Sequence, residues 1–368
     1  MLTRRGALVL GAAAAVASAP VAAQLLRPSL TDEGPSLRAL AAGKGLVFGA
    51  ANNNFWLRDR EFAFAYLRDC AILVPEYELK RDLTEPEHGH YDFSASDELL
   101  AFAKAHGLLF RGHPLLWFAS NPPWLEAAVS AAKDETIFTD YIHAAASHYL
   151  GRMHSWDVVN EAIACEDGRA DGLRNSFWLK KFGPSYIDHA FAAARAADPA
   201  ALLVYNDYGL ESDTPDHDAR RRATLKLLEG LIARGAPIGA LGLQGHITAF
   251  GPKINQKKLA AFLAEVQATG LRILVTEHDV DDGDGPIDAD ARDRAVADAS
   301  RRFLDIALDN PSTMALLTWG LSDRFLKAEG MRNSLLRGTP RSLPLDAAMQ
   351  PAPMRAAIAQ ALRGARRR

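Results

Sequence analysis

The chain has 368 residues, of which 48% are hydrophobic and 24% are charged, as in an ordinary globular protein. Its formal net charge of −3 provides no concentrated basic surface, so nucleic acid is not expected as a partner. The basic run from Arg363 to Arg368 is better interpreted as a solvated tail. A length above about 300 residues favours two domains, but barrels of alternating strands and helices reach it as one.

The N-terminal residues have the pattern of an export signal. Arg4 and Arg5 precede an apolar stretch over residues 7–19, which is too short to span a bilayer as a mature helix. Small residues before Gln24 fit signal-peptidase cleavage at that point. The paired arginines favour the twin-arginine route, with an ordinary secretory signal as the alternative. We expect a signal peptide over residues 1–23 and a periplasmic or secreted mature protein without membrane attachment.

From Leu46 onward, short apolar runs alternate with amphipathic stretches. Eight runs have the length and composition of buried strands: Leu46–Ala50, Cys70–Val74, Leu108–Gly112, Ser155–Asn160, Leu202–Asn206, Ala240–Gly245, Ile273–Thr276 and Met314–Trp319. Helical periodicity lies between them, at residues 95–105, 137–150, 186–197, 219–234, 257–269 and 291–308. This alternation predicts an α/β fold consisting of a single (β/α)8 TIM barrel over residues 24–368.

Polar or aromatic residues end or follow nearly every predicted strand. Functional residues of such barrels gather at the C-terminal strand ends. Here these residues are Glu76, His113, Glu161, Asn206, Asp207, Gln244, His246, Glu277 and Trp319. Two facing carboxylates are the minimum needed to cleave a glycosidic bond, because one protonates the leaving oxygen and the other attacks the sugar or activates water. The barrel would bring Glu161 and Glu277 together in this way.

The two cysteines and the acidic loop give little indication of cross-links or metals. Cys70 begins one apolar run and Cys165 follows another, so they would lie at opposite barrel ends and stay unpaired. No cysteine–histidine spacing predicts a metal site. The acidic residues of Asp281–Pro286 could ligate calcium, but they do not match the full loop motif, and a solvated turn is favoured. We expect no cofactor.

Five motifs carry a more specific resemblance: Gly112–Trp117, Trp156–Glu161, Tyr205–Tyr208, Gly242–His246 and Thr276–Val280. In this order and at these spacings, they resemble glycoside hydrolase family 10, the retaining endo-β-1,4-xylanases on a (β/α)8 barrel. The similarity runs from about Leu46 to Leu362. It implies double-displacement cleavage of xylan, with Glu161 as the general acid/base and Glu277 as the nucleophile.

The resemblance also implies how the remaining site residues act. His246 would hydrogen-bond Glu277 and keep it charged and oriented. Asn160 would donate to the sugar 2-hydroxyl, a contact that strengthens in the transition state. Trp319 would stack beneath a sugar ring. The other residues implied to bind or orient the polysaccharide are Glu76, Lys80, His113, Trp117, Asn206, Tyr208 and Gln244.

Three positions depart from the family's pattern. Tyr77 replaces an asparagine and Ser120 a glutamine, both of which would contact the distal sugar on the non-reducing side. Lys327 replaces a tryptophan that closes the site around the sugar's C5 position. Because Arg324 and Arg332 bring further positive charge, one hypothesis is a substituted or different β-linked glycan that bears acidic groups. An ordinary xylanase is an equally weighted alternative.

Two other classes of function fit less well. A non-catalytic glycan-binding barrel would not need both glutamates together with Asn160 and His246. A phosphate-binding isomerase would need a Gly-rich loop after strand seven or eight, where the acidic Asp281–Pro286 would repel phosphate. The leading interpretation is a secreted, monomeric endo-1,4-β-xylanase. The sequence leaves open the natural polysaccharide and the choice between endo and exo action.

Overall fold

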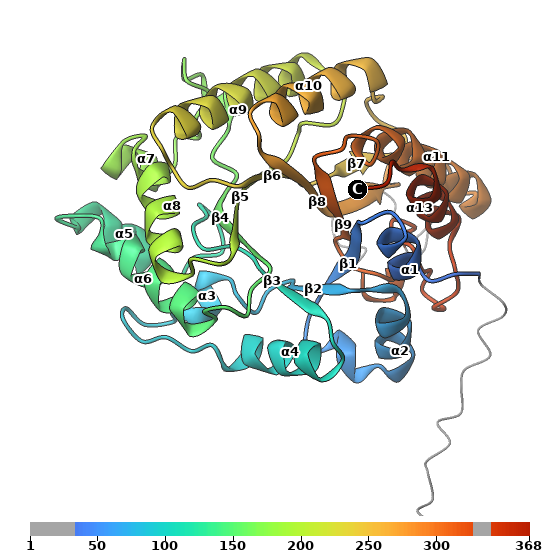
Figure 1. Cartoon of the computed structure of the whole chain (residues 1–368), viewed down its shortest axis with the longest axis horizontal. Helices are drawn as coiled ribbons and strands as arrows, with labels where there is room; N and C mark the ends of the chain where they lie inside the picture. Colours follow the sequence, from blue (N-terminus) through green and yellow to red (C-terminus); the bar gives the residue numbers. More distant parts are fainter. Residues whose placement is uncertain (1–33, 327–339) are drawn as a thin grey trace, which may run out of the picture. The chain divides into compact units, whose positions relative to one another are not determined.

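Eight parallel strands pair edge to edge and close into a barrel (Figure 1). A computed structural model describes residues 34–326 and 340–368. The barrel strands are β1 (Val47–Asn52), β2 (Ile72–Pro75), β3 (Leu109–Gly112), β4 (Ser155–Asn160), β5 (Leu202–Asp207), β6 (Ala240–Leu243), β8 (Arg272–Asp281) and β9 (Thr313–Thr318). Pairing of β6 with β8 and of β9 with β1 completes the ring. The predicted single TIM barrel is confirmed, and each predicted run overlaps one barrel strand.

The helices lie around the outside of the barrel (Figure 1). They are α1 (Leu37–Ala42), α2 (Arg60–Asp69), α3 (Arg81–Thr84), α4 (Ser94–Ala105), α5 (Leu125–Ala131), α6 (Thr136–His148), α7 (Phe177–Phe182), α8 (Tyr186–Ala197), α9 (Pro215–Ala233), α10 (Gln256–Ala268), α11 (Ala289–Ala307) and α13 (Pro353–Gly364). Their starts are set locally. Thr214, for example, caps α9 by accepting the His217 N–H, and Pro215 occupies the first turn, where no N–H partner is needed.

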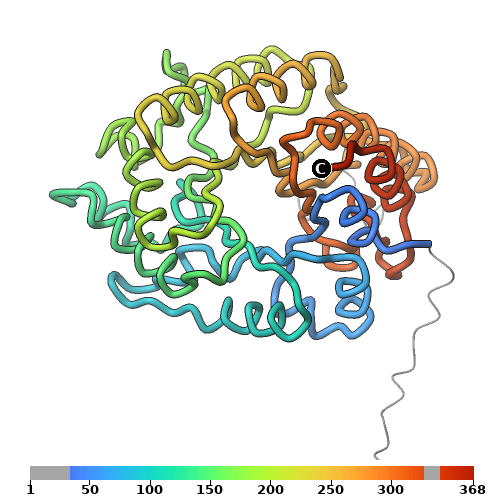
Figure 2. Tube along the Cα trace, viewed as in Figure 1, coloured from blue at the N-terminus to red at the C-terminus, as the bar shows by residue number. Residues whose placement is uncertain are grey.

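The first and last described helices close the ring of helices together. Figure 2 shows α1 and α13 side by side although they come from opposite ends of the chain. Buried Asp69, at the end of α2, accepts the Leu37 N–H at 2.9 Å and a guanidinium N–H of Arg355 at 2.8 Å. One carboxylate therefore ties α1, α2 and α13 together, which supports the pairing of β1 with β9.

Strand alternation separates two apolar clusters. The larger cluster fills the space between strands and helices and includes Leu73 and Val275. The smaller one lies on the opposite strand faces, which point into the barrel, and includes Ile72, Val204 and Leu274. Two residues further along β5 and β8, the inward positions become Asn206 and Thr276. The barrel is thus apolar below and polar at the C-terminal mouth.

One strand was not predicted. A short strand, β7 (His246–Thr248), pairs with an extension of β8 at Asp279–Asp281. The sequence analysis ended the seventh predicted strand, which corresponds to β8, at Thr276. Beyond the barrel rim β8 continues to Asp281, because β7 provides hydrogen-bond partners for its backbone there.

Several other expectations are settled by the described residues. Cys70 is buried and Cys165 is half-buried, and both are free, as predicted. The expected solvated turn is only partly confirmed: Asp281 is exposed and accepts the Gly283 N–H at 2.8 Å, whereas Asp282 is buried because it pairs with Arg292 of α11 at 2.6 Å. Within residues 34–326 and 340–368, no helix is long and apolar enough to cross a bilayer.

Other predictions fall outside the part of the chain that the structure describes. They concern the signal peptide at residues 1–23, the positive charges of Lys327 and Arg332, and the tryptophan that Lys327 replaces.

Candidate active site

The two predicted catalytic glutamates stand at the C-terminal mouth of the barrel. Glu161 directly follows β4, and Glu277 lies in β8 just past the apolar core of that strand. The Glu161 N–H donates to the Asn206 carbonyl at 2.8 Å, and the Glu277 N–H donates to the Gln244 carbonyl at 2.9 Å. Each glutamate is therefore fixed by the neighbouring strand, and the barrel sets their relative placement.

Glu277 is buried and held in its ionised form. Its Oε1 accepts the Asn206 amide N–H at 2.7 Å, and its Oε2 lies 3.2 Å from His246 Nε2. Burial alone would raise the pKa of Glu277, but the hydrogen bond from His246 and the charges of His113 and His246 outweigh it and lower the pKa to about 2. A carboxylate that stays ionised at neutral pH is suited to act as a nucleophile.

His246 forms a bridge between two carboxylates of β8. Its Nε2 faces Glu277, and its Nδ1 lies 2.8 Å from Asp279 Oδ1. Burial would lower the pKa of His246, but Asp279 and Glu277 raise it well above its usual value. The ring is then an imidazolium that donates to both carboxylates. Asp279 was not predicted as a site residue, although it belongs to one of the five motifs.

Glu161 occupies a strained backbone position. Its φ is +59°, a left-handed conformation that costs a side chain about 1–3 kcal/mol. The Nε–H of Arg174 donates to the Glu161 carbonyl at 2.7 Å and helps to hold that conformation. Strain of this kind is retained where the direction of a side chain matters. Nothing in the local sequence indicated either the strain or Arg174.

Three side chains hold the Glu161 carboxylate. Trp117 Nε1–H donates to Oε2 at 2.9 Å, while the amides of Gln244 and Asn160 donate to Oε1 at 3.0 Å and 3.1 Å. The carboxylate is therefore oriented by three elements, β4 and the segments after β3 and β6. Trp117, Gln244 and Asn160 were all predicted site residues, and the structure brings them to Glu161.

A short chain of hydrogen bonds connects the two glutamates. Thr276 Oγ1 donates to Asn206 Oδ1 at 2.7 Å, which fixes the amide so that its Nδ2 faces Glu277 at 2.7 Å and Asn160 Oδ1 at 2.9 Å. Asn160 in turn donates to Glu161 at 3.1 Å. The two glutamates therefore belong to one hydrogen-bonded network.

His113 contacts a buried ion pair, formed by Asp157 and Arg111, that was not predicted. Its Nδ1 lies 2.8 Å from Asp157 Oδ2 and 3.9 Å from Glu277 Oε1. Asp157 also accepts an N–H of Arg111 at 2.5 Å. In the described residues, His113, Asp157 and Glu277 place potential metal-ligating atoms within 4.8 Å of one another. Because Arg111, His246 and Asn206 already satisfy these carboxylates, the cluster is explained by hydrogen bonding.

The other predicted residues differ in how close they come to the glutamates. Trp319 packs edge-on against His113 at 5.2 Å between ring centroids, and the Lys80 ammonium lies 5.5 Å from the Trp117 ring centroid. Glu76 meets the Asn53 amide at 3.4 Å, and the Tyr208 hydroxyl accepts from Arg174 at 3.0 Å. Neither Glu76 nor Tyr208 forms a hydrogen bond with Glu161 or Glu277.

The departures from the family's pattern are built into local contacts. Tyr77 is 41% exposed, its hydroxyl donates to Asp82, and its ring lies 5.1 Å from the Lys80 ammonium. Ser120, at φ +48°, accepts the Asp82 N–H through its carbonyl at 3.1 Å. The two replaced positions are thus connected through Asp82.

Arg324 does not supply the free positive charge expected of it. Its guanidinium pairs with Asp59 at 2.6 Å and with Glu61 at 2.9 Å. The carboxylates of Asp59, just before α2, and Glu61, in its first turn, therefore neutralise the charge of Arg324.

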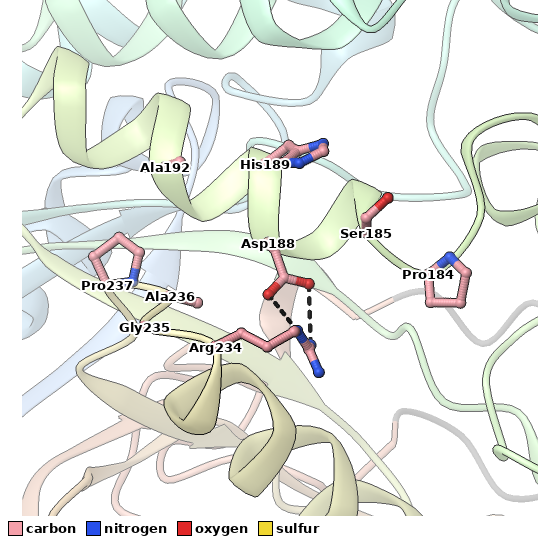
Figure 3. A pocket seen from close by; sticks show the side chains of 9 residues that line it. All are labelled: Pro184, Ser185, Asp188, His189, Ala192, Arg234, Gly235, Ala236 and Pro237. Atoms are coloured by element: carbon pink, nitrogen blue, oxygen red, sulfur yellow. Dashed lines mark hydrogen bonds and ion pairs between the residues drawn. The ribbon is translucent and has the colours of Figure 1, made fainter.

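A hollow of about 560 Å³ elsewhere on the surface is separate from this site (Figure 3). It lies between the start of α8 and the turn after α9. Asp188 and Arg234 cross it with paired hydrogen bonds of 2.8 Å and 3.0 Å. None of the residues that contact the two glutamates lines it.

Residues 36–361 match the model of glycosyl hydrolase family 10. The chain belongs to this family. It is 33% identical over 329 residues to endo-1,4-beta-xylanase B of Thermotoga neapolitana, covering 88% of this chain and 90% of that one. Native xylanase 10B from Thermotoga maritima superposes with a TM-score of 0.79 at 31% identity, covering 89% of this chain and 98% of that one. Xylanase 10B from Thermotoga petrophila in complex with xylobiose gives 0.79 at 30% identity, covering 90% and 98%. The family resemblance seen in the motifs is confirmed, and the protein is a xylanase-like glycoside hydrolase.

Replacing His246 with Asn should move the acidic limb of the kcat/KM–pH profile to higher pH. His246 is the main partner that holds the pKa of Glu277 at about 2, against the opposing effect of burial. Without the imidazolium the pKa of Glu277 rises, so a larger share of it is protonated and inactive at low pH. The profile is measured on a soluble glycoside between pH 3 and pH 8. An unshifted acidic limb would contradict this role of His246.

Proposed function

We propose that the protein is a retaining endo-1,4-β-xylanase. The observation that carries this proposal is the pair of glutamates in one hydrogen-bonded network, of which Glu277 is kept ionised by His246. The xylanase names of its relatives support xylan as the substrate. Trp117, Asn160 and Gln244 surround Glu161 with donors that can orient its carboxyl group toward a leaving oxygen.

The geometry supports a double displacement. In the first step Glu277 attacks the anomeric carbon while Glu161 transfers its proton to the departing glycosidic oxygen, which leaves a covalent glycosyl–enzyme ester. In the second step Glu161 takes a proton from water, the water attacks the same carbon, and Glu277 is released. His246 stabilises the Glu277 carboxylate before attack and again as it leaves. Two inversions at one carbon give a product with retained configuration.

Removal of each glutamate should give a different kinetic result. Glu277→Ala should abolish turnover on all substrates, because the covalent step is lost. Glu161→Ala should spare aryl glycosides with good leaving groups, because these need little protonation. Added azide should then accelerate Glu161→Ala and yield a β-glycosyl azide, identified by proton NMR. An α-glycosyl azide would show that the two roles are assigned wrongly.

We further propose that Tyr77 and Ser120 weaken the binding of unsubstituted xylan. Neither side chain offers the amide group found at these positions in the family's pattern, and the Tyr77 hydroxyl is already engaged by Asp82. A site that lacks such contacts favours a different substituent pattern, and a substituted or acid-bearing β-glycan is the alternative substrate. Among the described residues, the compensated charge of Arg324 gives the acidic version no support.

The double variant Tyr77→Asn, Ser120→Gln should raise kcat/KM on unsubstituted xylan. The expected gain is on the order of tenfold if each restored hydrogen bond contributes about 1 kcal/mol. Initial rates on linear xylan, glucuronoxylan, β-glucan and acidic exopolysaccharides provide the measurement, with Phe64→Ala as a control at an equally exposed aromatic residue of α2. If wild type already prefers plain xylan and the variant is unchanged, the altered-specificity proposal is wrong.

We also propose that the protein is exported by the twin-arginine route and acts as a monomer in the periplasm or outside the cell. The support is the N-terminal pattern of Arg4 and Arg5 before an apolar stretch. Changing both arginines to lysine should abolish export of the full chain, measured by fractionation of expressing cells. Continued export would favour the ordinary secretory route. Light scattering of the mature protein tests the monomer.

A further inference from the structure

Glu211 is a buried carboxylate that the proposed chemistry does not use. It lies between β5 and α9, and only 1% of it is exposed. Its Oε2 accepts the Leu210 N–H at 2.8 Å, and its Oε1 accepts the Gly245 N–H at 2.9 Å. Burying a carboxylate is costly even when backbone groups satisfy it, so an apolar residue would be the simpler choice for stability alone.

Gly245 is held at both of its flanking peptide groups. Glu211 accepts the N–H of the 244–245 peptide at 2.9 Å, and the carbonyl of the 245–246 peptide accepts from His278 Nδ1 at 2.8 Å. His278 is itself fixed by the Ser300 hydroxyl of α11, 2.9 Å from its Nε2. Burial lowers the pKa of His278 to about 4, so the ring is neutral, and the carbonyl acceptor identifies the Nδ1–H tautomer. Gly245 has φ +81°, and a Cβ there would lie 3.1 Å from the Phe303 ring.

The residues on either side of Gly245 each hold one of the glutamates. Gln244 donates to Glu161 at 3.0 Å, and His246 lies 3.2 Å from Glu277. A shift of Gly245 would displace the backbone of both neighbours together. The contact from Glu211 to Gly245 therefore lies between the two residues that hold the glutamates.

We propose that Glu211 is a positioning residue that holds the backbone at Gly245 through its N–H and so aligns Gln244 with Glu161 and His246 with Glu277. It acts through these neighbours and does not touch substrate. The inference rests on the proposed function, because alignment is measured through the reaction of the two glutamates. Its effect should fall on kcat, since misalignment of a reacting group by even about 1 Å is costly.

The test compares Glu211→Ala and Glu211→Gln with wild type on linear xylan and on an aryl β-xyloside. Glu211→Ala removes both acceptors and should lower kcat by about tenfold or more, with KM changed by less than about threefold. Glu211→Gln keeps one carbonyl for the Gly245 N–H and should recover part of that loss. Both variants should move the acidic limb of kcat/KM to higher pH.

The sign of this pH shift follows from the groups around His246 and Glu277. His246 contacts Glu277 and Asp279 of β8, and Glu211 of the loop after β5 is near enough for the His246 charge to affect its pKa. Glu277 also lies 3.9 Å from His113, the residue after β3. A displaced His246, or one that has lost the nearby negative charge, stabilises ionised Glu277 less well. More acid-inactive enzyme then forms at a given low pH.

Asp198 offers a matched control. It is a fully buried carboxylate that accepts a glycine N–H, from Gly151 at 3.3 Å, and it precedes β5 at the opposite end of the barrel from the glutamates. Asp198→Asn makes the same change of charge and should lower the melting temperature without altering kcat or the acidic limb. Thermal unfolding of all variants separates loss of fold from loss of alignment.

The outcomes are distinct. Wild type that cleaves neither substrate overturns the proposed function itself. Active wild type with a folded Glu211→Ala variant of equal kcat overturns the positioning role, as does a change in KM alone. If Glu211→Ala does not fold, Glu211→Gln provides the test. An acidic limb of its kcat/KM–pH profile identical to that of wild type would then overturn the positioning role.

Discussion

The site depends on the hydrogen bonds of one amide, that of Asn206. It donates to Glu277 at 2.7 Å and to Asn160 at 2.9 Å, and Asn160 donates to Glu161. An amide can do this only if its orientation is fixed, and Thr276 fixes it by donating to its oxygen at 2.7 Å. Glu277 can then remain ionised beside a second carboxyl group. The proposed roles of Glu161 as acid and Glu277 as nucleophile rest on this arrangement.

The barrel makes this network possible because its members are distributed over three strands. Asn160 ends β4, Asn206 lies near the end of β5, and Thr276 lies in β8. Pairing of β4 with β5, of β5 with β6 and of β6 with β8 brings these positions together at the mouth of the barrel. Closure of the ring through β1 and β9 fixes the relative positions of these strands. The strain at Glu161 is tolerated because contacts from Asn206 and Arg174 determine its backbone on both sides.

In the proposed function, recognition of the glycan and chemistry at the bond are assigned to different residues. The groups around Glu161 and Glu277 match the family's motifs, whereas Tyr77 and Ser120 depart from its pattern. Each replacement is stabilised locally, through Asp82, so neither requires adjustment near the glutamates. If Tyr77 and Ser120 set substrate preference as proposed, that preference can change while Glu161 and Glu277 stay in place.

The sequence by itself determined the barrel, because apolar runs of strand length alternated with helical periodicity and the period depends only on neighbouring residues. It also located Glu161, Glu277, Gln244 and His246, because functional residues of a barrel follow its strands, and the family resemblance added their partners Trp117 and Asn160. The tertiary structure alone decided which partner holds which oxygen, and it revealed Asp157, Arg111, Arg174 and Asp279. It likewise corrected Arg324, whose partners Asp59 and Glu61 lie more than 260 positions away in the sequence. Such pairings depend on distances of a few ångströms between residues on different strands and loops, and these are set only when the ring of strands closes.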